Sequence, residues 1–218
     1  MKRLLVMAGI LYSAVAVAGG VGESHPHRGV VASYEGAPPT VDLSDDDLAT
    51  LARGDAVRKS VQYGSSGGRG VAVMDVNAPP KYVWKKIGDY SSYPDWVENL
   101  EECEIYGKDG RNVYVRFEAS MMGINAEWFI HHIYNVPAGY VTWTLDYDRK
   151  SDLDDSVGYW RVTELSSDPP LTRVEYSVEL RVATWLPGSL EDALANKGLV
   201  IATSWVKKQA EAEYNASR

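Results

Sequence analysis

Two adjacent histidines, His131 and His132, are the residues best suited to acid–base chemistry, because imidazole titrates near neutral pH. They lie in a strand-like stretch, so their side chains point to opposite faces and cannot bind one metal ion together. Trp128 and Ile130 match the apolar faces of the neighbouring segments, which would place His132 inside, although both faces carry apolar residues and the inward face stays open. We treat His132 and Tyr176 as the candidates for catalysis. The alternative is that His132 is a hydrogen-bonded core residue.

The other reactive residues form no catalytic set. The single cysteine, Cys103, excludes an internal disulfide and a cysteine-based zinc site, and we expect it to be a small buried hydrophobe. No Gly-x-Ser-x-Gly elbow occurs, and no Gly-Lys-Ser/Thr follows the glycines of segment 64–68. Asp152, Asp154 and Asp155 fall in a predicted loop and are expected to be solvated. We therefore predict neither a cofactor nor a metal site.

The elements that must position these residues are mostly strands. Apolar residues alternate in six segments joined by short turns, which favours antiparallel neighbours: 100–106, 113–119, 125–134, 140–147, 157–165 and 172–182. A strand at 70–76 and two short helices, at 82–90 and around 93–97, precede them, and an extra strand is possible at 56–63. One polar and one apolar face per strand predict a sheet covered on one side only.

A long helix is predicted to close the sheet. It begins after the cap residue Ser189 and runs to the end of the chain, with one apolar stripe among polar residues, formed by Leu190, Leu194, Ile201, Trp205 and Ala212. Gly198 lies on the same line. A glycine inside a helix costs about 1 kcal/mol relative to alanine, so either the sheet or a ligand should approach closely there. The predicted fold class is α+β, a curved antiparallel sheet of about seven strands wrapped on this helix.

Several short motifs resemble those of START-like domains. They are Ala78-Pro79, Val83-Trp84 and Tyr93-Pro94-x-Trp96 in segment 71–96, the segments 158–162 and 172–176, and Leu186-Pro187 before the last helix. Residues 69–214 are most similar to the coenzyme Q-binding (Coq10-type) and polyketide cyclase/dehydratase branch of the Bet v1-like (SRPBCC) superfamily. The resemblance implies a helix-grip fold with a hydrophobic cavity between sheet and helix. Members divide between carriers of lipids or quinones and cyclase-like enzymes, and the fold does not choose between them.

Such a cavity would be lined by the inward-facing residues. From the sheet we predict Val115, Phe117, Trp128, Ile130, Trp143, Trp160, Tyr176 and Val178, and from the helix Leu194, Gly198, Ile201 and Trp205. Our leading hypothesis is a protein that carries or sequesters one hydrophobic small molecule, such as a lipid, a quinone or a sterol-like compound. A polyketide cyclase or dehydratase using the same cavity is the alternative, and a protein-interaction module is the second. In a further alternative, the seven tryptophans fill the core and leave no cavity.

The N-terminal third has a different character. Lys2 and Arg3 precede an apolar segment, 4–18, that ends in a small-x-small cleavage pattern, which predicts a secretory signal at residues 1–18 and a periplasmic or secreted protein. The segment is short for a membrane span, although a retained anchor is the alternative. Residues 19–68 are predicted to be an extension, with a loosely attached linker to about Ser44 and a helix at 45–52, before a ligand-binding domain at 69–218. The net charge of −8 and the lack of a basic cluster argue against nucleic acid as a partner.

Overall fold

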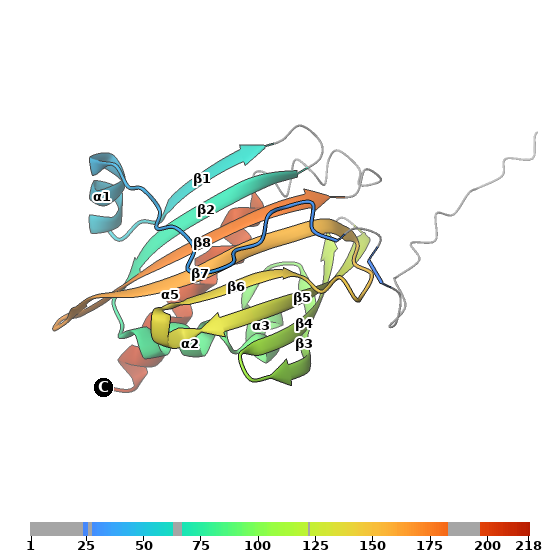
Figure 1. Cartoon of the computed structure of the whole chain (residues 1–218). Coiled ribbons are helices and arrows are strands. Elements are labelled where there is room, and N and C mark those ends of the chain that lie inside the picture. The colour runs from blue at the N-terminus through green and yellow to red at the C-terminus, as the bar shows by residue number, and fades with distance from the viewer. Residues whose placement is uncertain (1–23, 26–27, 63–66, 122, 183–196) are drawn as a thin grey trace, which may run out of the picture.

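The computed structural model describes residues 24–25, 28–62, 67–121, 123–182 and 197–218. Their main element is one antiparallel sheet of eight strands in the order β1-β2-β8-β7-β6-β5-β4-β3 (Figure 1). The strands are β1 (Val57–Gln62), β2 (Gly67–Val76), β3 (Leu100–Asp109), β4 (Asn112–Met121), β5 (Ile124–Asn135), β6 (Tyr140–Leu145), β7 (Leu153–Ser167) and β8 (Pro170–Val182). Seven strands were predicted. The eighth is β1, which pairs with β2 from Val57 opposite Val73 to Gln62 opposite Gly68 and forms the edge.

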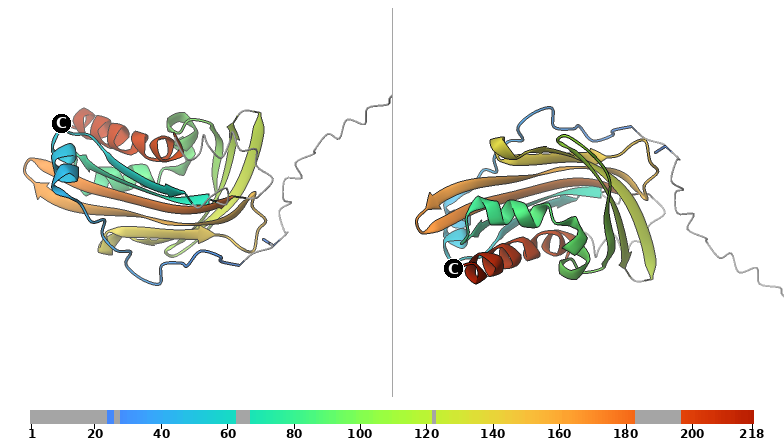
Figure 2. Two further views of the ribbon diagram at one scale, coloured as in Figure 1. Left: turned by 90° about the horizontal axis from the view of Figure 1, so that it is seen from above. Right: turned by 90° about the horizontal axis from the view of Figure 1, so that it is seen from below.

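The described residues also form several helical segments. They are α1 (Asp45–Ala52), α2 (Pro80–Ile87), η1 (Tyr90–Ser92), α3 (Tyr93–Trp96), η2 (Val136–Ala138) and α5 (Leu199–Ala216). Figure 2 shows α2, α3 and α5 on the concave face of the curved sheet. The predicted α+β helix-grip class is therefore confirmed. The predicted cap Ser189 and the first part of the predicted helix lie outside the described residues.

The far end of α5 is fixed to α2 by charged side chains. Lys85 and Lys86 both pair with Glu213, the latter at 2.7 Å. Asn77 donates from its backbone and its side-chain amide to Glu211, at 2.8 and 3.0 Å. These contacts fix the C-terminal end of α5 beside α2, and the first turns of α5 stand over the opposite end of the concave face.

Side chains fill the core at the α2 end of the concave face. The fully buried residues there include Val76, Val83, Ile87, Val115, Val141, Leu145, Val174, Val206 and Ala210. The predicted helix stripe is correct at Trp205, which is 4% exposed, and wrong at Ala212, which is exposed. Thr203, Val206 and Ala210 are buried instead. Thr203 Oγ1 donates to the carbonyl of Leu199, which satisfies the one polar group among them.

The convex face of the sheet is also covered, which corrects the prediction of a one-sided sheet. Residues 28–44, which we call the N-terminal strap, run along this face (Figures 1 and 2). The amide of Val41 donates to Glu175 at 2.8 Å, Tyr159 donates to the carbonyl of Pro39 at 3.2 Å, and Arg161 donates to the carbonyl of Pro38. Tyr159 is only 1% exposed. The prediction of a loosely attached linker is wrong for residues 28–44, because side chains of Tyr159, Arg161 and Glu175 on the convex face hydrogen-bond to the strap's backbone.

Asp155 is a second correction on this face. It was predicted to be solvated in a loop, but β7 begins earlier than predicted and Asp155 is fully buried within it. Its carboxylate accepts from Tyr147 Oη at 2.7 Å, from the amide of Val31 at 2.7 Å and from the amide of Ser156 at 2.9 Å. A buried carboxylate is stable only when such donors surround it. Asp155 therefore anchors the first part of the strap.

Replacing Asp155 by alanine is expected to lower the free energy of unfolding by about 2–3 kcal/mol, because the Tyr147 hydroxyl and the Val31 amide would lose their acceptor in a buried place. Urea unfolding of both proteins measures this loss. The matched control is Asp154→Ala, a change at the half-exposed neighbour, which should stay within about 0.5 kcal/mol of the wild type. Equal stability of the two variants would contradict the anchoring role.

Candidate functional site

A cavity of about 400 Å³ lies between the concave face of the sheet and the first turns of α5. Sites for small molecules are typically concave and roughly 300–1,000 Å³ in volume. The cavity extends from the buried aromatic residues under α5 to the strand ends, where Gly67, Ile124, Leu153 and Val182 line it. Val61 lines this end too. We call this end the mouth.

The structure brings most of the predicted wall residues together. Ten of the twelve line the cavity: Phe117, Trp128, Ile130, Trp143, Trp160, Tyr176, Val178, Gly198, Ile201 and Trp205. Val115 does not line it. It faces inward, as predicted, but it is fully buried in the filled part of the core, two residues beyond Phe117 on β4. Leu194 lies outside the described residues.

His132 faces the cavity and His131 faces the convex side. The register between β4 and β5 pairs Phe117 with Trp128 and Val115 with Ile130, so His132 follows on the same inner face. His132 is 6% exposed. His131 is half-buried, stacks on Tyr114 at 4.4 Å and contacts Asn112 through Nε2 at 2.8 Å. The sequence left the inward face of β5 open, and the structure assigns it to Trp128, Ile130 and His132.

Sequence reasoning missed the contribution of η1 and α3. Tyr90 and Tyr93 line the cavity from these two short elements. Tyr90 Oη is 2.6 Å from Tyr134 Oη, and Tyr93 donates to the carbonyl of Ile87 at 2.6 Å. The signal was present in the motif Tyr93-Pro94-x-Trp96, which was used only to recognise the fold.

Aromatic rings form much of the cavity wall. Phe117 and Trp128 stack in parallel at 5.5 Å, and Trp160 contacts Tyr176 at 4.5 Å. Two of the indole N–H groups are already used, since Trp205 donates to the carbonyl of Ala202 at 3.0 Å and Trp143 donates to Ser156 at 3.3 Å. These indoles therefore offer the cavity carbon surface rather than free donors, which suits an apolar occupant.

The inner end of the cavity carries no charge near neutral pH. Burial, together with the neighbouring His131, lowers the pKa of His132 to about 3, so its imidazole is neutral. Burial also raises the pKa of Tyr176 and, more strongly, that of Tyr90. The charged residues Arg69, Glu98 and Asp152 also line the cavity, but Arg69 lies near the start of β2, and Glu98 and Asp152 lie in the loops before β3 and β7.

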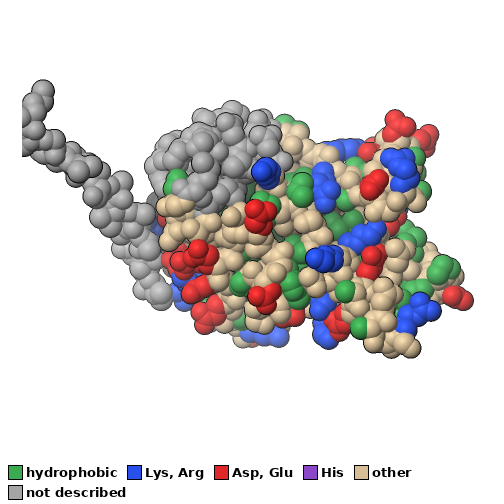
Figure 3. All heavy atoms as spheres, turned by 180° about the vertical axis from the view of Figure 1, so that it is seen from behind, with side chains coloured by type: hydrophobic (Ala, Val, Ile, Leu, Met, Phe, Trp, Pro, Cys, Tyr) green, Lys and Arg blue, Asp and Glu red, His purple; other side chains and the backbone are tan. Residues whose placement is uncertain are grey.

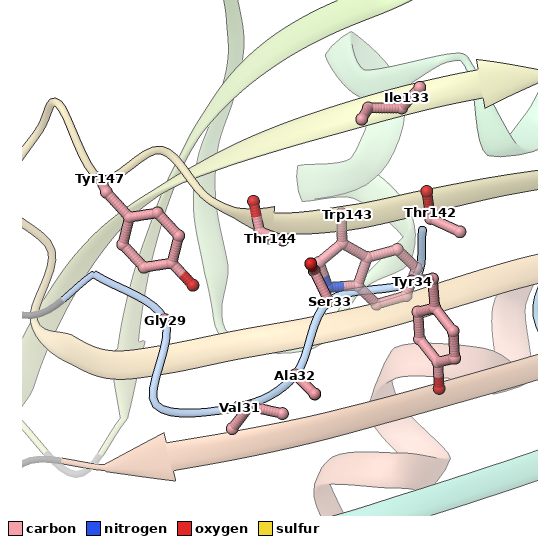
Figure 4. Close-up of a pocket in the computed structure, with 10 residues that line it drawn as sticks. All are labelled: Gly29, Val31, Ala32, Ser33, Tyr34, Ile133, Thr142, Trp143, Thr144 and Tyr147. Atoms are coloured by element: carbon pink, nitrogen blue, oxygen red, sulfur yellow. The ribbon is translucent and has the colours of Figure 1, made fainter. Parts of the chain in front are cut away.

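A second cavity, of about 460 Å³, lies on the convex face between the strap and β5–β6. Figure 4 shows Tyr147 towards one end and Tyr34 with Thr142 towards the other, with Thr144 and Ser33 between them. Hydroxyl groups are prominent in its lining, and Tyr147 Oη is already bound to Asp155. The cavity under α5, with its aromatic wall, is the better site for an apolar molecule.

Three further observations concern metal ions, membrane helices and surface charge. Among the described residues, no cluster of histidine, cysteine, aspartate or glutamate side chains is arranged to hold a metal ion. No helix in the described ranges is long and apolar enough to cross a bilayer. On the face that Figure 3 presents, acidic and basic side chains are interspersed rather than segregated, so this face offers no continuous basic surface to a nucleic acid.

Solved structures share this fold at low sequence identity. A protein of Thermus thermophilus has a TM-score of 0.52 and 18% identity, over 74% of this chain and 98% of that one. A START superfamily protein from Mycobacterium smegmatis has a TM-score of 0.51 and 18% identity, over 75% and 99%. The di-domain ARO/CYC StfQ from the steffimycin biosynthetic pathway has a TM-score of 0.52 and 18% identity, over 66% and 45%. These likenesses establish the fold alone.

The sequence itself identifies the family. No curated protein sequence matches the chain. Residues 69–211, well over half of the chain, match the family model described as polyketide cyclase / dehydrase and lipid transport. This range begins at β2 and includes the cavity-lining part of α5, so it covers the elements that build most of the cavity. The chain is therefore a member of the polyketide cyclase / dehydrase and lipid transport family, within the START-like (SRPBCC) superfamily.

Proposed function

We propose that this protein binds one apolar small molecule, such as a lipid, a quinone or a sterol-like compound, in the cavity under α5 and carries or sequesters it. The observation that supports this most strongly is a preformed cavity of about 400 Å³ with an aromatic wall. An apolar molecule that enters it leaves water, which contributes roughly 25 cal/mol for each Å² of buried apolar surface. The family description, which includes lipid transport, is consistent with this role.

A polyketide cyclase or dehydratase is the second candidate, and the family description favours it equally. The acid–base properties of the cavity favour carriage. A general acid or base works best with a pKa near the working pH, whereas the pKa of His132 is about 3 and burial raises that of Tyr176. Loss of turnover of a polyketide-like substrate in a folded His132→Ala variant would reverse this preference. An interaction module without a ligand would need no such cavity.

Gly198→Leu is expected to weaken ligand uptake more than it weakens folding. Gly198 lines the cavity directly before α5. The next residue, Leu199, lies close to Gly70 of β2: a Cβ added to Gly70 would be 3.1 Å from Leu199 Cδ1. A leucine side chain at 198 would occupy cavity space, while leucine suits a helix better than glycine by up to about 1 kcal/mol.

The measurement is the fluorescence of the neutral apolar probe N-phenylnaphthylamine during titration, together with urea unfolding. We expect at least about a tenfold loss of probe affinity, equivalent to about 1.4 kcal/mol, without a matching loss of stability. The control is Val200→Leu, a change at a neighbouring residue that is 44% exposed. Equal losses of affinity and stability in Gly198→Leu would indicate tight core packing instead of a ligand site.

We also propose that the protein is exported. Support comes from the sequence of residues 1–18, with its two basic residues, its apolar segment and its small-x-small ending. The mass of the protein isolated from its own cells tests this. A chain that begins at Gly19 supports export with cleavage, and an intact Met1 would contradict cleavage of the signal.

A further inference from the structure

Trp160 on β7 and Tyr176 on β8 are the innermost cavity-lining residues of these two strands. They lie directly opposite each other in the β7–β8 ladder, with their ring centroids 4.5 Å apart. From Tyr176 the wall on β8 continues through Val178 to Val182 at the mouth. In the other direction Val174 is fully buried in the filled core. Trp160 and Tyr176 therefore mark the inner end of the cavity on this side.

Both residues carry a hydrogen-bonding group that the described protein leaves unused. The side-chain contacts of Tyr176 are with the rings of Trp143 and Trp160, and neither the Tyr176 hydroxyl nor the Trp160 indole N–H is hydrogen-bonded to a described residue. Among the described residues, neither group is one of the unpartnered polar atoms that protein encloses completely. Tyr176 is 8% exposed and Trp160 6%, and both line the cavity, so the accessible surface of these two groups opens into it.

The other buried aromatic groups of the wall have partners. The hydroxyls of Tyr90 and Tyr93 are bound to Tyr134 and to the carbonyl of Ile87. The indole N–H of Trp128 is unused too, but Trp128 is only half-buried. Native proteins rarely leave a buried donor without an acceptor, because its lost hydration is not replaced. An occupant of the cavity can supply the acceptor that the inner end lacks.

We propose that the ligand carries a neutral carbonyl group, which accepts a hydrogen bond from the Tyr176 hydroxyl at the inner end, and that its apolar body extends towards the mouth. This inference rests on the proposed ligand-binding function and adds the chemical class and the orientation of the ligand. An indole N–H only donates, and a tyrosine hydroxyl can donate, so an acceptor suits both groups. A carbonyl oxygen has two lone pairs and no proton, whereas a ligand hydroxyl would bring a further donor.

A carboxylate is also an acceptor, but the inner end offers it no counter-ion. Burial raises the pKa of Tyr176 and lowers that of His132 to about 3, so both side chains are neutral at about pH 7. Among the described lining residues the only cation is Arg69, and its Nε donates to Ser177 Oγ at 3.4 Å on the other face of the sheet. A carboxylate at the inner end would therefore lose its hydration without gaining an opposite charge.

The test compares four probes of one ring system, fluorenone, fluorenol, fluorene and fluorene-9-carboxylate, by displacement of N-phenylnaphthylamine from the full-length protein at about pH 7. We expect fluorenone to bind most tightly, about five- to tenfold better than fluorene, as one buried hydrogen bond allows, and the carboxylate to bind least. Equal affinities for fluorenone and fluorene, or tightest binding of fluorenol or of the carboxylate, would overturn the inference while leaving ligand binding intact. If neither N-phenylnaphthylamine nor any of the four probes binds, the proposed function fails as well.

Two tyrosine variants assign the preference to one hydroxyl. Tyr176→Phe removes only this hydroxyl and should reduce the preference for fluorenone to about twofold or less, while fluorene still binds. The matched control is Tyr159→Phe, at a buried tyrosine of the convex face whose hydroxyl donates to the carbonyl of Pro39, and it should keep the full preference. A full preference for fluorenone in Tyr176→Phe would overturn the role of Tyr176.

Urea unfolding of the same two variants tests the unused hydroxyl without any ligand. Tyr159→Phe should unfold at a lower urea concentration than the wild type, because it loses a buried hydrogen bond to the strap. Tyr176→Phe should not, because its hydroxyl has no partner in the protein to lose. A loss of stability in Tyr176→Phe as large as that in Tyr159→Phe, or a failure to fold, would show that this hydroxyl is bound within the protein and would overturn the inference.

Discussion

Gly158→Ala is expected to lower the free energy of unfolding by about 3 kcal/mol, or to prevent folding, because the site cannot accept a methyl group. A Cβ at residue 158 would overlap Cζ2 of Trp143 and the backbone carbonyl oxygen of Ser177, and it would lie 2.6 Å from Cε2 of Trp143. The carbonyl belongs to β8, which pairs with β7 on both sides of this position. Relief therefore requires the indole of Trp143 to move into the cavity that it lines.

The same substitution should reduce probe binding, since a displaced Trp143 would occupy ligand space. Urea unfolding and titration with N-phenylnaphthylamine measure the two effects. Gly36→Ala is the matched control, because a Cβ on Gly36 would meet no atom within 4 Å, and it should leave both quantities unchanged. A Gly158→Ala protein with wild-type stability would show that Trp143 does not pack on the strand as described.

His132→Phe is expected to make the protein less sensitive to acid. The folded state holds the pKa of His132 at about 3, against an ordinary value of 6.5. Between these two values the unfolded chain binds a proton at this position and the folded chain does not, so stability falls as the pH falls. From about pH 7 to about pH 5 this difference destabilises the wild type by about 2 kcal/mol. A phenylalanine cannot bind the proton, so that part of the acid sensitivity disappears.

The measurement is the free energy of unfolding by urea at about pH 7 and about pH 5, for the wild type and for His132→Phe. Other groups also contribute to the slope. Burial lowers the pKa of His131, which adds to the acid sensitivity, and raises that of Glu175, which opposes it. Both remain in the variant and cancel in the difference. Parallel pH profiles of the two proteins would contradict a neutral, buried His132.

The alternation of apolar residues was sufficient to predict the sheet and most of the cavity wall. In a strand, side chains two residues apart share a face, so Phe117, Trp143, Trp160 and Tyr176 could be assigned inward without a structure. The same rule gives no information on depth along the strand. Val115 and Phe117 share a face, yet only Phe117 reaches the cavity. Depth depends on where α2, α3 and α5 cross the sheet, which the pattern of a single strand does not contain.

The strap was not predictable from the same signals. It binds the sheet mostly through its backbone, with the amides of Val31 and Val41 donating to the carboxylates of Asp155 and Glu175. Backbone donors are present at nearly every residue, so they leave no periodic trace in the sequence. Asp155 and Glu175 looked like ordinary surface residues in the sequence, because their partners in the strap are backbone amides. The burial of these two carboxyl groups can be recognised only in the structure, because the amides that bind them are more than a hundred residues away in the chain.

Organic extraction of the protein purified from its own cells, followed by mass spectrometry of the extract, tests the proposed function most directly. The account predicts one main apolar compound, in an amount close to that of the protein, and a large loss of this compound from Gly198→Leu. A protein that is consistently empty after purification, and that takes up no apolar probe when one is offered, would contradict it.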